Sequence, residues 1–185
     1  TPSDVRLQSP SPVPSIRVAV IADRTTGDED GLAVLRRAVR EINLLQPDVV
    51  LHIGDLVPGY TRDMRKWEED IAEVKAILAD LEAPFYPLPG NHDVITGTGD
   101  PTDRRGEDLY RKHFGPLYYS FDCGSAHFVM LDTEEQLQSQ PRFTDRQIAW
   151  LQDDLARTDA RSIFVFMHKP AWEMATYPDS RWDEV

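Results

Sequence analysis

The chain has 185 residues, of which 41% are hydrophobic and 28% are charged, as in an ordinary globular protein. This length supports one sizeable hydrophobic core and is short for two, so we expect one domain over residues 16–185. A formal net charge of −12 at pH 7 argues against a nucleic-acid polymer as substrate, because no basic surface would neutralise its phosphates. We expect no membrane partner, since no apolar run is long enough to cross a bilayer.

Residues 1–15 contain four prolines and four serines without a period, which predicts a flexible leader. The chain starts at Thr1, and its origin stays open between a protein exported with loss of a leader and a trimmed cytoplasmic one. The single cysteine, Cys123, excludes a disulfide within the chain and leaves the compartment undecided.

The first half of the chain alternates strand-like and helix-like patterns. Apolar runs predict strands over 16–21, 48–55 and 84–88. Between them, apolar residues recur at three- and four-residue spacing over 32–45 and 67–81, which predicts two amphipathic helices. This strand-helix alternation predicts a parallel sheet with right-handed crossovers.

The second half of the chain differs in composition and in the order of its predicted elements. Residues 96–108 are rich in Gly, Thr and Asp and predict a loop at the rim of a site, followed by the end of a short helix at 110–114. Two strands, over 116–122 and 126–131, are separated by a turn short enough for an antiparallel hairpin.

A last helix and strand follow the hairpin. Thr144 and Gln147 have the spacing of a capping box, which predicts a helix through Leu155. Residues 161–167 predict the last strand, and the tail from Trp172 has no clear period.

Four strand-like runs end in residues that bind metal ions. They are followed by Asp23, by Gly54-Asp55, by Gly90-Asn91-His92-Asp93 and by His168. Ligands of open α/β sheets bind outside the carboxyl ends of the strands, and hard cations prefer carboxylate and amide oxygens with some imidazole. Each residue alone fits a turn, but the set together favours a metal site on which we expect these side chains to converge.

This ordered set, with the late His168-Lys169-Pro170, resembles the calcineurin-like metallophosphoesterase family of the purple-acid-phosphatase-like superfamily. The resemblance spans residues 16–172 and includes intervening matches at Trp67, 85–87, 114–121, 131–133 and 147–151. It implies a layered α/β/β/α metallophosphoesterase sandwich. It also implies metal-dependent hydrolysis of a small or exposed phosphomonoester or phosphodiester.

The resemblance assigns a role to each residue of the set. Asp23 would bind a first metal ion, Asp55 would bridge both ions, and Asn91 with His168 would bind the second. A hydroxide held by the metals would attack phosphorus, and His92 would give a proton to the leaving oxygen. Asp93 would support the loop.

The chain departs from the family pattern twice. The usual Asp-x-His is here Asp23-Arg24-Thr25, and the downstream Gly-His-x-His element is absent before Val185. We therefore expect one tight ion (Mn, Zn or Fe) on Asp55, Asn91 and His168, and a weak second one. A C-terminally truncated fold would also expose a sheet edge, which self-association or a partner chain would cover.

Two functions from different classes stay open. The metal ligands favour a phosphoesterase, whereas the two departures favour a non-catalytic or partner-dependent remnant that serves as a binding or assembly module. Three other histidines are interpreted as structural: His52 and His127 lie within apolar strands, and His113 precedes Phe114-Gly115. Of the three, we expect His52 to come nearest the site. The tryptophans at 67, 150 and 172 are interpreted as core or rim packing.

Overall fold

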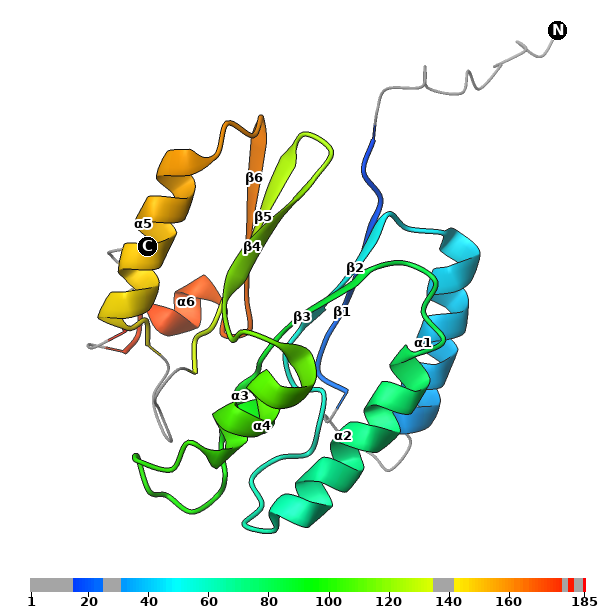
Figure 1. Cartoon of the computed structure of the whole chain (residues 1–185), viewed down its shortest axis with the longest axis vertical. Coiled ribbons are helices and arrows are strands. Elements are labelled where there is room, and N and C mark those ends of the chain that lie inside the picture. The colour runs from blue at the N-terminus through cyan, green and yellow to red at the C-terminus, as the bar shows by residue number, and fades with distance from the viewer. Residues whose placement is uncertain (1–14, 25–30, 135–141, 178–179, 182–184) are drawn as a thin grey trace, which may run out of the picture.

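Two three-stranded sheets form the centre of the protein (Figure 1). The structure is a computed structural model that describes residues 15–24, 31–134, 142–177, 180–181 and 185. The first sheet has the parallel order β1 (Val18–Ile21), β2 (Val49–Ile53), β3 (Phe85–Leu88). The second has the order β4 (Tyr119–Cys123), β5 (Ala126–Leu131), β6 (Ser162–Met167). The hairpin of β4 and β5 is antiparallel, as predicted, and β6 is parallel to β5.

Helices cover the outer face of each sheet. Helices α1 (Gly31–Leu45) and α2 (Met64–Leu78) share a core cluster with Ile21 and Phe85 of the first sheet. Helices α5 (Asp145–Arg157) and α6 (Ala171–Met174) pack against Val129 and Leu131 of the second. The predicted α/β/β/α layers are therefore confirmed.

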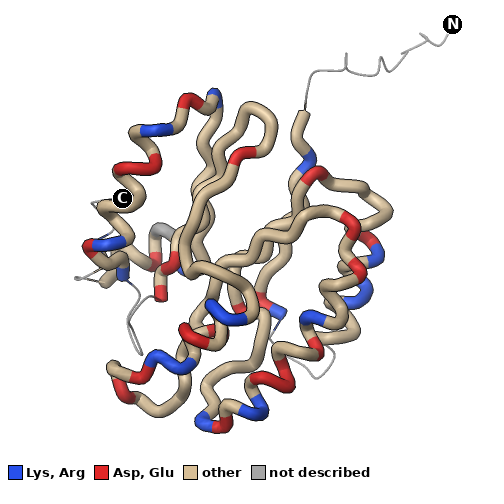
Figure 2. The backbone as a smooth tube through the Cα atoms, in the orientation of Figure 1, with Lys and Arg blue, Asp and Glu red and all other residues tan. Residues whose placement is uncertain are grey.

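The core between the sheets explains why the strands are almost uniformly apolar. It joins buried residues of both sheets: Val49, Leu51, Leu88, Ala126, Phe128 and Met130. All six residues of β5 are buried, because alternate side chains meet the first sheet and α5. Figure 2 shows the consequence: acidic and basic residues lie along the helices and loops, and the strands are nearly free of them.

Two short helices lie beyond the carboxyl end of the first sheet. Helix α3 (Asn91–Val94) directly follows β3, and α4 (Arg105–Phe114) packs against it. The predicted loop over 96–108 is wrong in its second part, because α4 begins at Arg105. Gly106 gave this stretch the composition of a loop, yet it serves close packing: a Cβ there would collide with the backbone of Val94 and the ring of Trp67.

Two further expectations need correction. Thr144 does cap α5, since its Oγ1 accepts from the backbone N–H of Gln147 at 3.3 Å. The Gln147 side chain does not complete a capping box. It instead makes two hydrogen bonds, of 2.7 and 2.8 Å, with the backbone of Asp132. The tail also contains a helical turn, α6, that its sequence did not predict.

The tryptophans that were interpreted as core or rim packing differ in their exposure. Trp67 lies in the core and is 1% exposed, whereas Trp172 is 79% exposed. His127 is buried and bonds to the carboxylates of Asp122 and Asp154 at 2.6 and 2.8 Å. None of the helices in the described part of the chain has the length and apolarity needed to cross a membrane.

The leader at 1–15 lies outside the described residues except for Ser15, and the domain bounds stay a prediction.

The free edge of β6 is apolar and exposed. Within the described residues β6 pairs with β5 alone, and Ile163, Phe164 and Val165 are each nearly half exposed. A groove of about 340 Å³ separates this strand from β1 and is lined by residues that include Val18, Val20 and Phe166. The open side of the sandwich therefore lies between the two edge strands.

Candidate metal centre

The loops after β1 and β2 adopt backbone conformations that are unusual outside glycine. Asp23 and Asp55 have φ angles of 51° and 65°, and Gly54 has a φ of 100°. The backbone N–H of Asp23 donates to the carbonyl of Gly54 at 3.0 Å, which holds the two loops together. Strained residues of this kind persist where the surrounding structure holds them, often at functional sites.

The buried carboxylate of Asp93 fixes the loop that carries Asp55. Its Oδ2 accepts from the N–H groups of Asp55 and Gly90 at 2.7 and 2.8 Å. Its Oδ1 accepts from Leu56 and Val57 at 2.8 and 3.1 Å. Burial raises the pKa of Asp93 to about 6, and the backbone donors oppose this rise because they favour the ionised form. Asp93 thus has the supporting position that the sequence predicted.

His168 extends from the end of β6 toward the loops of the first sheet. Its Nδ1 lies 2.9 Å from the carbonyl oxygen of Ile53, an acceptor, so Nδ1 carries a proton. In a neutral ring Nε2 then presents a lone pair. That Nε2 lies 3.0 Å from Asn91 Oδ1 and 3.5 Å from Asp55 Oδ1, both of which are also electron-rich.

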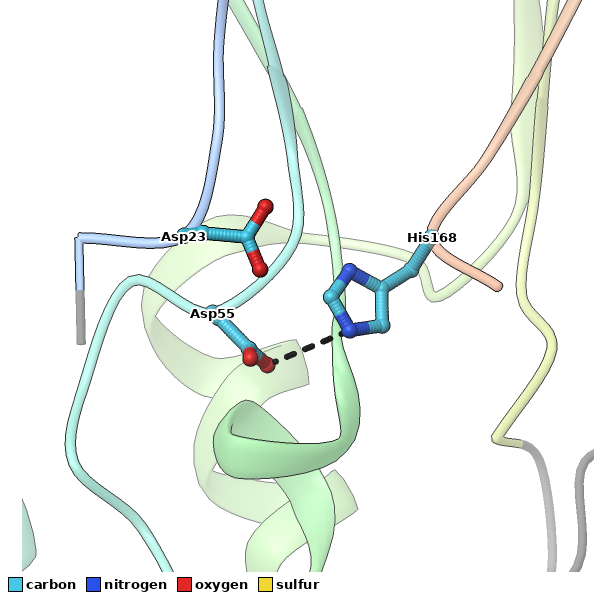
Figure 3. A group of neighbouring side chains, drawn as sticks. All are labelled: Asp23, Asp55 and His168. Atoms are coloured by element: carbon cyan, nitrogen blue, oxygen red, sulfur yellow. Dashed lines mark ion pairs between the residues drawn. The ribbon is translucent and has the colours of Figure 1, made fainter. Parts of the chain in front are cut away.

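Asp23 completes a group of side chains that converge and could donate electron pairs to a metal ion, called the donor group below. Ligand atoms of Asp23, Asp55 and His168 all lie within 4.8 Å of one another. Figure 3 shows these three side chains pointing toward one another from separate segments of the chain. Carboxylate, amide and imidazole atoms that converge without a hydrogen between them can be brought together by a cation. In addition, histidines that bind a metal through one ring nitrogen commonly donate the N–H of the other to a backbone carbonyl. The residues present therefore fit the metal centre that the family resemblance implies.

Gly90 makes this convergence possible. A Cβ at position 90 would collide with the side chain and backbone N of Asp55 and would approach His168 Cε1 to 2.9 Å. No residue larger than glycine fits between these two side chains, so the Gly-Asn-His-Asp sequence begins with glycine for a packing reason.

His92 lies at the edge of the donor group. Its Nδ1 is 2.6 Å from the carbonyl oxygen of Pro58, so Nδ1 donates and Nε2 faces the site at 3.9 Å from Asp55 Oδ2. The backbone N–H of His92 also donates to Asp55 Oδ1 at 3.0 Å. The structure thus brings together all the predicted site residues, whose roles stay predictions. Thr25 lies outside the described residues.

Other residues beside the centre were missed in the sequence. The Tyr60 hydroxyl accepts from Asn91 Nδ2 at 2.8 Å. Glu134 is 3% exposed, and burial raises its pKa although the positive charge of Lys169 opposes this rise. Glu134 directly follows Leu131-Asp132-Thr133, a run that the resemblance already marked, so this position was within reach of sequence reasoning.

A model of calcineurin-like phosphoesterases matches residues 16–184. The chain belongs to this family. Mouse acid phosphatase type 7 is 27% identical over 172 residues, which cover 85% of this chain and 36% of that protein. A probable glycerophosphodiester phosphodiesterase from Arcobacter nitrofigilis is 22% identical over 138 residues, with 74% and 47% covered. This family member therefore spans about a third to a half of the length of these curated relatives.

A solved structure supports the fold of the family member. The crystal structure of a dimetal phosphatase from Danio rerio matches with a TM-score of 0.61 and 17% identity, over 84% of this chain and 70% of that one.

We predict that Asp93→Asn destabilises the protein through the loop of Asp55. An amide has one acceptor oxygen, so its NH₂ would face two of the four backbone donors in either orientation. We expect a loss of roughly 3 kcal/mol in the free energy of unfolding, from buried donors left unsatisfied. Urea denaturation followed by circular dichroism measures it. Asp80→Asn, at an exposed position, is the control. Equal stability of the two variants would contradict the supporting role.

Proposed function

We propose that this chain hydrolyses small or exposed phosphate esters with the help of metal ions. The observation that carries the proposal is the approach of His168 Nε2 to Asn91 Oδ1 and Asp55 Oδ1, at 3.0 and 3.5 Å, in a ring whose other nitrogen is bonded to a carbonyl. Similarity to an acid phosphatase and to a phosphodiesterase supports both monoesters and diesters as candidate substrates.

The chain's own residues divide into ligands and a proton donor. Asp55, Asn91 and His168 would hold one ion tightly, and Asp23 with Asp55 would hold a second one weakly. A bound manganese, zinc or iron ion would supply positive charge that stabilises phosphate oxygens and lowers the pKa of water. In its imidazolium form His92 would carry two protons: the one at Nδ1 is held by the Pro58 carbonyl, and the one at Nε2 would pass to the leaving oxygen and leave a neutral ring.

The first prediction from this proposal concerns metal binding. Calorimetric titration of metal-free protein with Mn²⁺ should give one tight site per chain. His168→Ala should weaken it by roughly 100-fold or more, because even the loss of an outer-shell partner costs 10–100-fold. Asp23→Ala should spare the tight site and remove the weak one. His113→Ala, a remote histidine, is the control. Two tight sites of similar affinity, or indifference to His168→Ala, would show that the ligands are misassigned.

The second prediction concerns His92. A general acid matters most when the leaving oxygen is basic, so His92→Ala should lower kcat for phenyl phosphate by roughly 10²–10⁴-fold at saturating Mn²⁺. The loss should be smaller for p-nitrophenyl phosphate and its bis ester, whose leaving group is a weak base, and Mn²⁺ affinity should be retained. An equal loss on all three substrates would contradict the proton-donor role.

The alternative is a partner-dependent or non-catalytic module, and the exposed edge of β6 favours it. Unpaired strand edges pair with other chains, and β6 contains no charged residue that would oppose this. We propose that this edge is covered by self-association, despite the net charge of −12.

Sedimentation velocity over a range of concentrations tests this self-association. The wild-type chain should form dimers that Phe164→Lys abolishes. Leu155→Lys, which places the same charge at an exposed position of α5, should leave them intact. A monomer at all concentrations would overturn the proposal.

A further inference from the structure

Tyr60 contacts both polar residues that follow Gly90. Its hydroxyl accepts a hydrogen bond from Asn91 Nδ2 at 2.8 Å. Its ring also meets the His92 imidazole edge to face, with ring centroids 4.7 Å apart and an interplanar angle of 88°. Tyr60 belongs to the loop after β2, so these contacts connect two separate segments of the chain.

The hydrogen bond determines what the Asn91 amide can present to the centre. An amide has an oxygen end and an NH₂ end, and the oxygen is the metal ligand. With Oδ1 directed at His168 Nε2, the NH₂ group points the other way and needs an acceptor, which the Tyr60 hydroxyl provides. Asn91 can bind a metal ion at the centre only in this orientation, with its oxygen toward the centre and its NH₂ group toward Tyr60.

The backbone of Tyr60 supports a positioning role independently. Its φ angle is 48°, in the left-handed region that bulky residues rarely adopt. The N–H of Tyr60 donates to the carbonyl of Ile95 at 3.0 Å, and Gly97 packs so closely on Tyr60 that a Cβ there would collide with its carbonyl oxygen. The surrounding loop thus holds a costly conformation, and that conformation places the ring against His92.

We propose that Tyr60 is a positioning residue that holds the Asn91 amide with its oxygen toward the metal centre and supports the His92 ring. This inference rests on the proposed function. Tyr60 would bind neither the ion nor the reacting atoms. Its hydroxyl would act through Asn91 on metal affinity, and its ring would act through His92 on turnover.

Two variants separate the hydroxyl from the ring. Tyr60→Phe keeps the ring, so it should raise the Kd for Mn²⁺ roughly tenfold, as outer-shell changes do, with kcat at saturating Mn²⁺ close to that of the wild type. Tyr60→Leu should raise the Kd similarly and also lower kcat for phenyl phosphate. Tyr86→Phe removes the hydroxyl of a partly buried tyrosine that packs against the core between the sheets, and it should change neither quantity.

A metal-free measurement keeps the inference testable if the chain binds no Mn²⁺. In ¹⁵N-labelled metal-free protein, the Asn91 side-chain NH₂ resonances, identified by their loss in Asn91→Ala, should shift in Tyr60→Phe and stay unchanged in Tyr86→Phe. Unmoved resonances in Tyr60→Phe would overturn the inference. Failure of the wild-type chain to bind Mn²⁺ would overturn the proposed function instead. Mn²⁺ binding by Tyr60→Phe with wild-type affinity would also overturn the positioning role.

Discussion

The carboxylate of Asp93 joins two loops that lie more than thirty residues apart in the sequence, and the geometry of the centre depends on it. It binds four backbone N–H groups, three of them on the loop that starts at Asp55. Because that loop has left-handed residues at its start, it has no regular structure to hold it. One buried acceptor therefore replaces the hydrogen-bond ladder that a strand or helix would supply, and it fixes where Asp55 points.

The same region concentrates negative charge. The carboxylate of Asp55 lies close to that of Asp23 and interacts electrostatically with that of Glu134. The net charge of the protein is already −12. Lys169 offsets part of this charge, but a phosphate ester would still meet carboxylates as it approached the centre. A cation at the convergent donors would offset this negative charge, so under the proposed function metal binding would favour the binding of a phosphate ester, and the ester would favour metal binding in turn.

Sequence reasoning located the layers and the donor residues because both follow from local patterns. Apolar runs ended in polar residues at Asp23, Asp55 and His168, and the carboxyl ends of the strands then meet in the fold. It failed where a residue's role depends on a distant neighbour. Gly106 was placed in a predicted loop because its close packing against Val94 of α3 is not visible in the local sequence. Tyr60 was not singled out at all. The contact of Tyr60 with Asn91 depends on a positive φ angle that no period or propensity encodes.

The donors of the centre come from four separate strand ends, and the contact of His168 with Ile53 joins residues 115 apart in the sequence. No single hairpin or strand-helix-strand unit of this chain contains a complete set. The donor group therefore forms only once both sheets have docked, and any ion that binds there binds the folded state alone. Such an ion draws the folding equilibrium of the whole sandwich toward the native state by mass action, so the thermal midpoint of unfolding becomes a measure of the supply of metal.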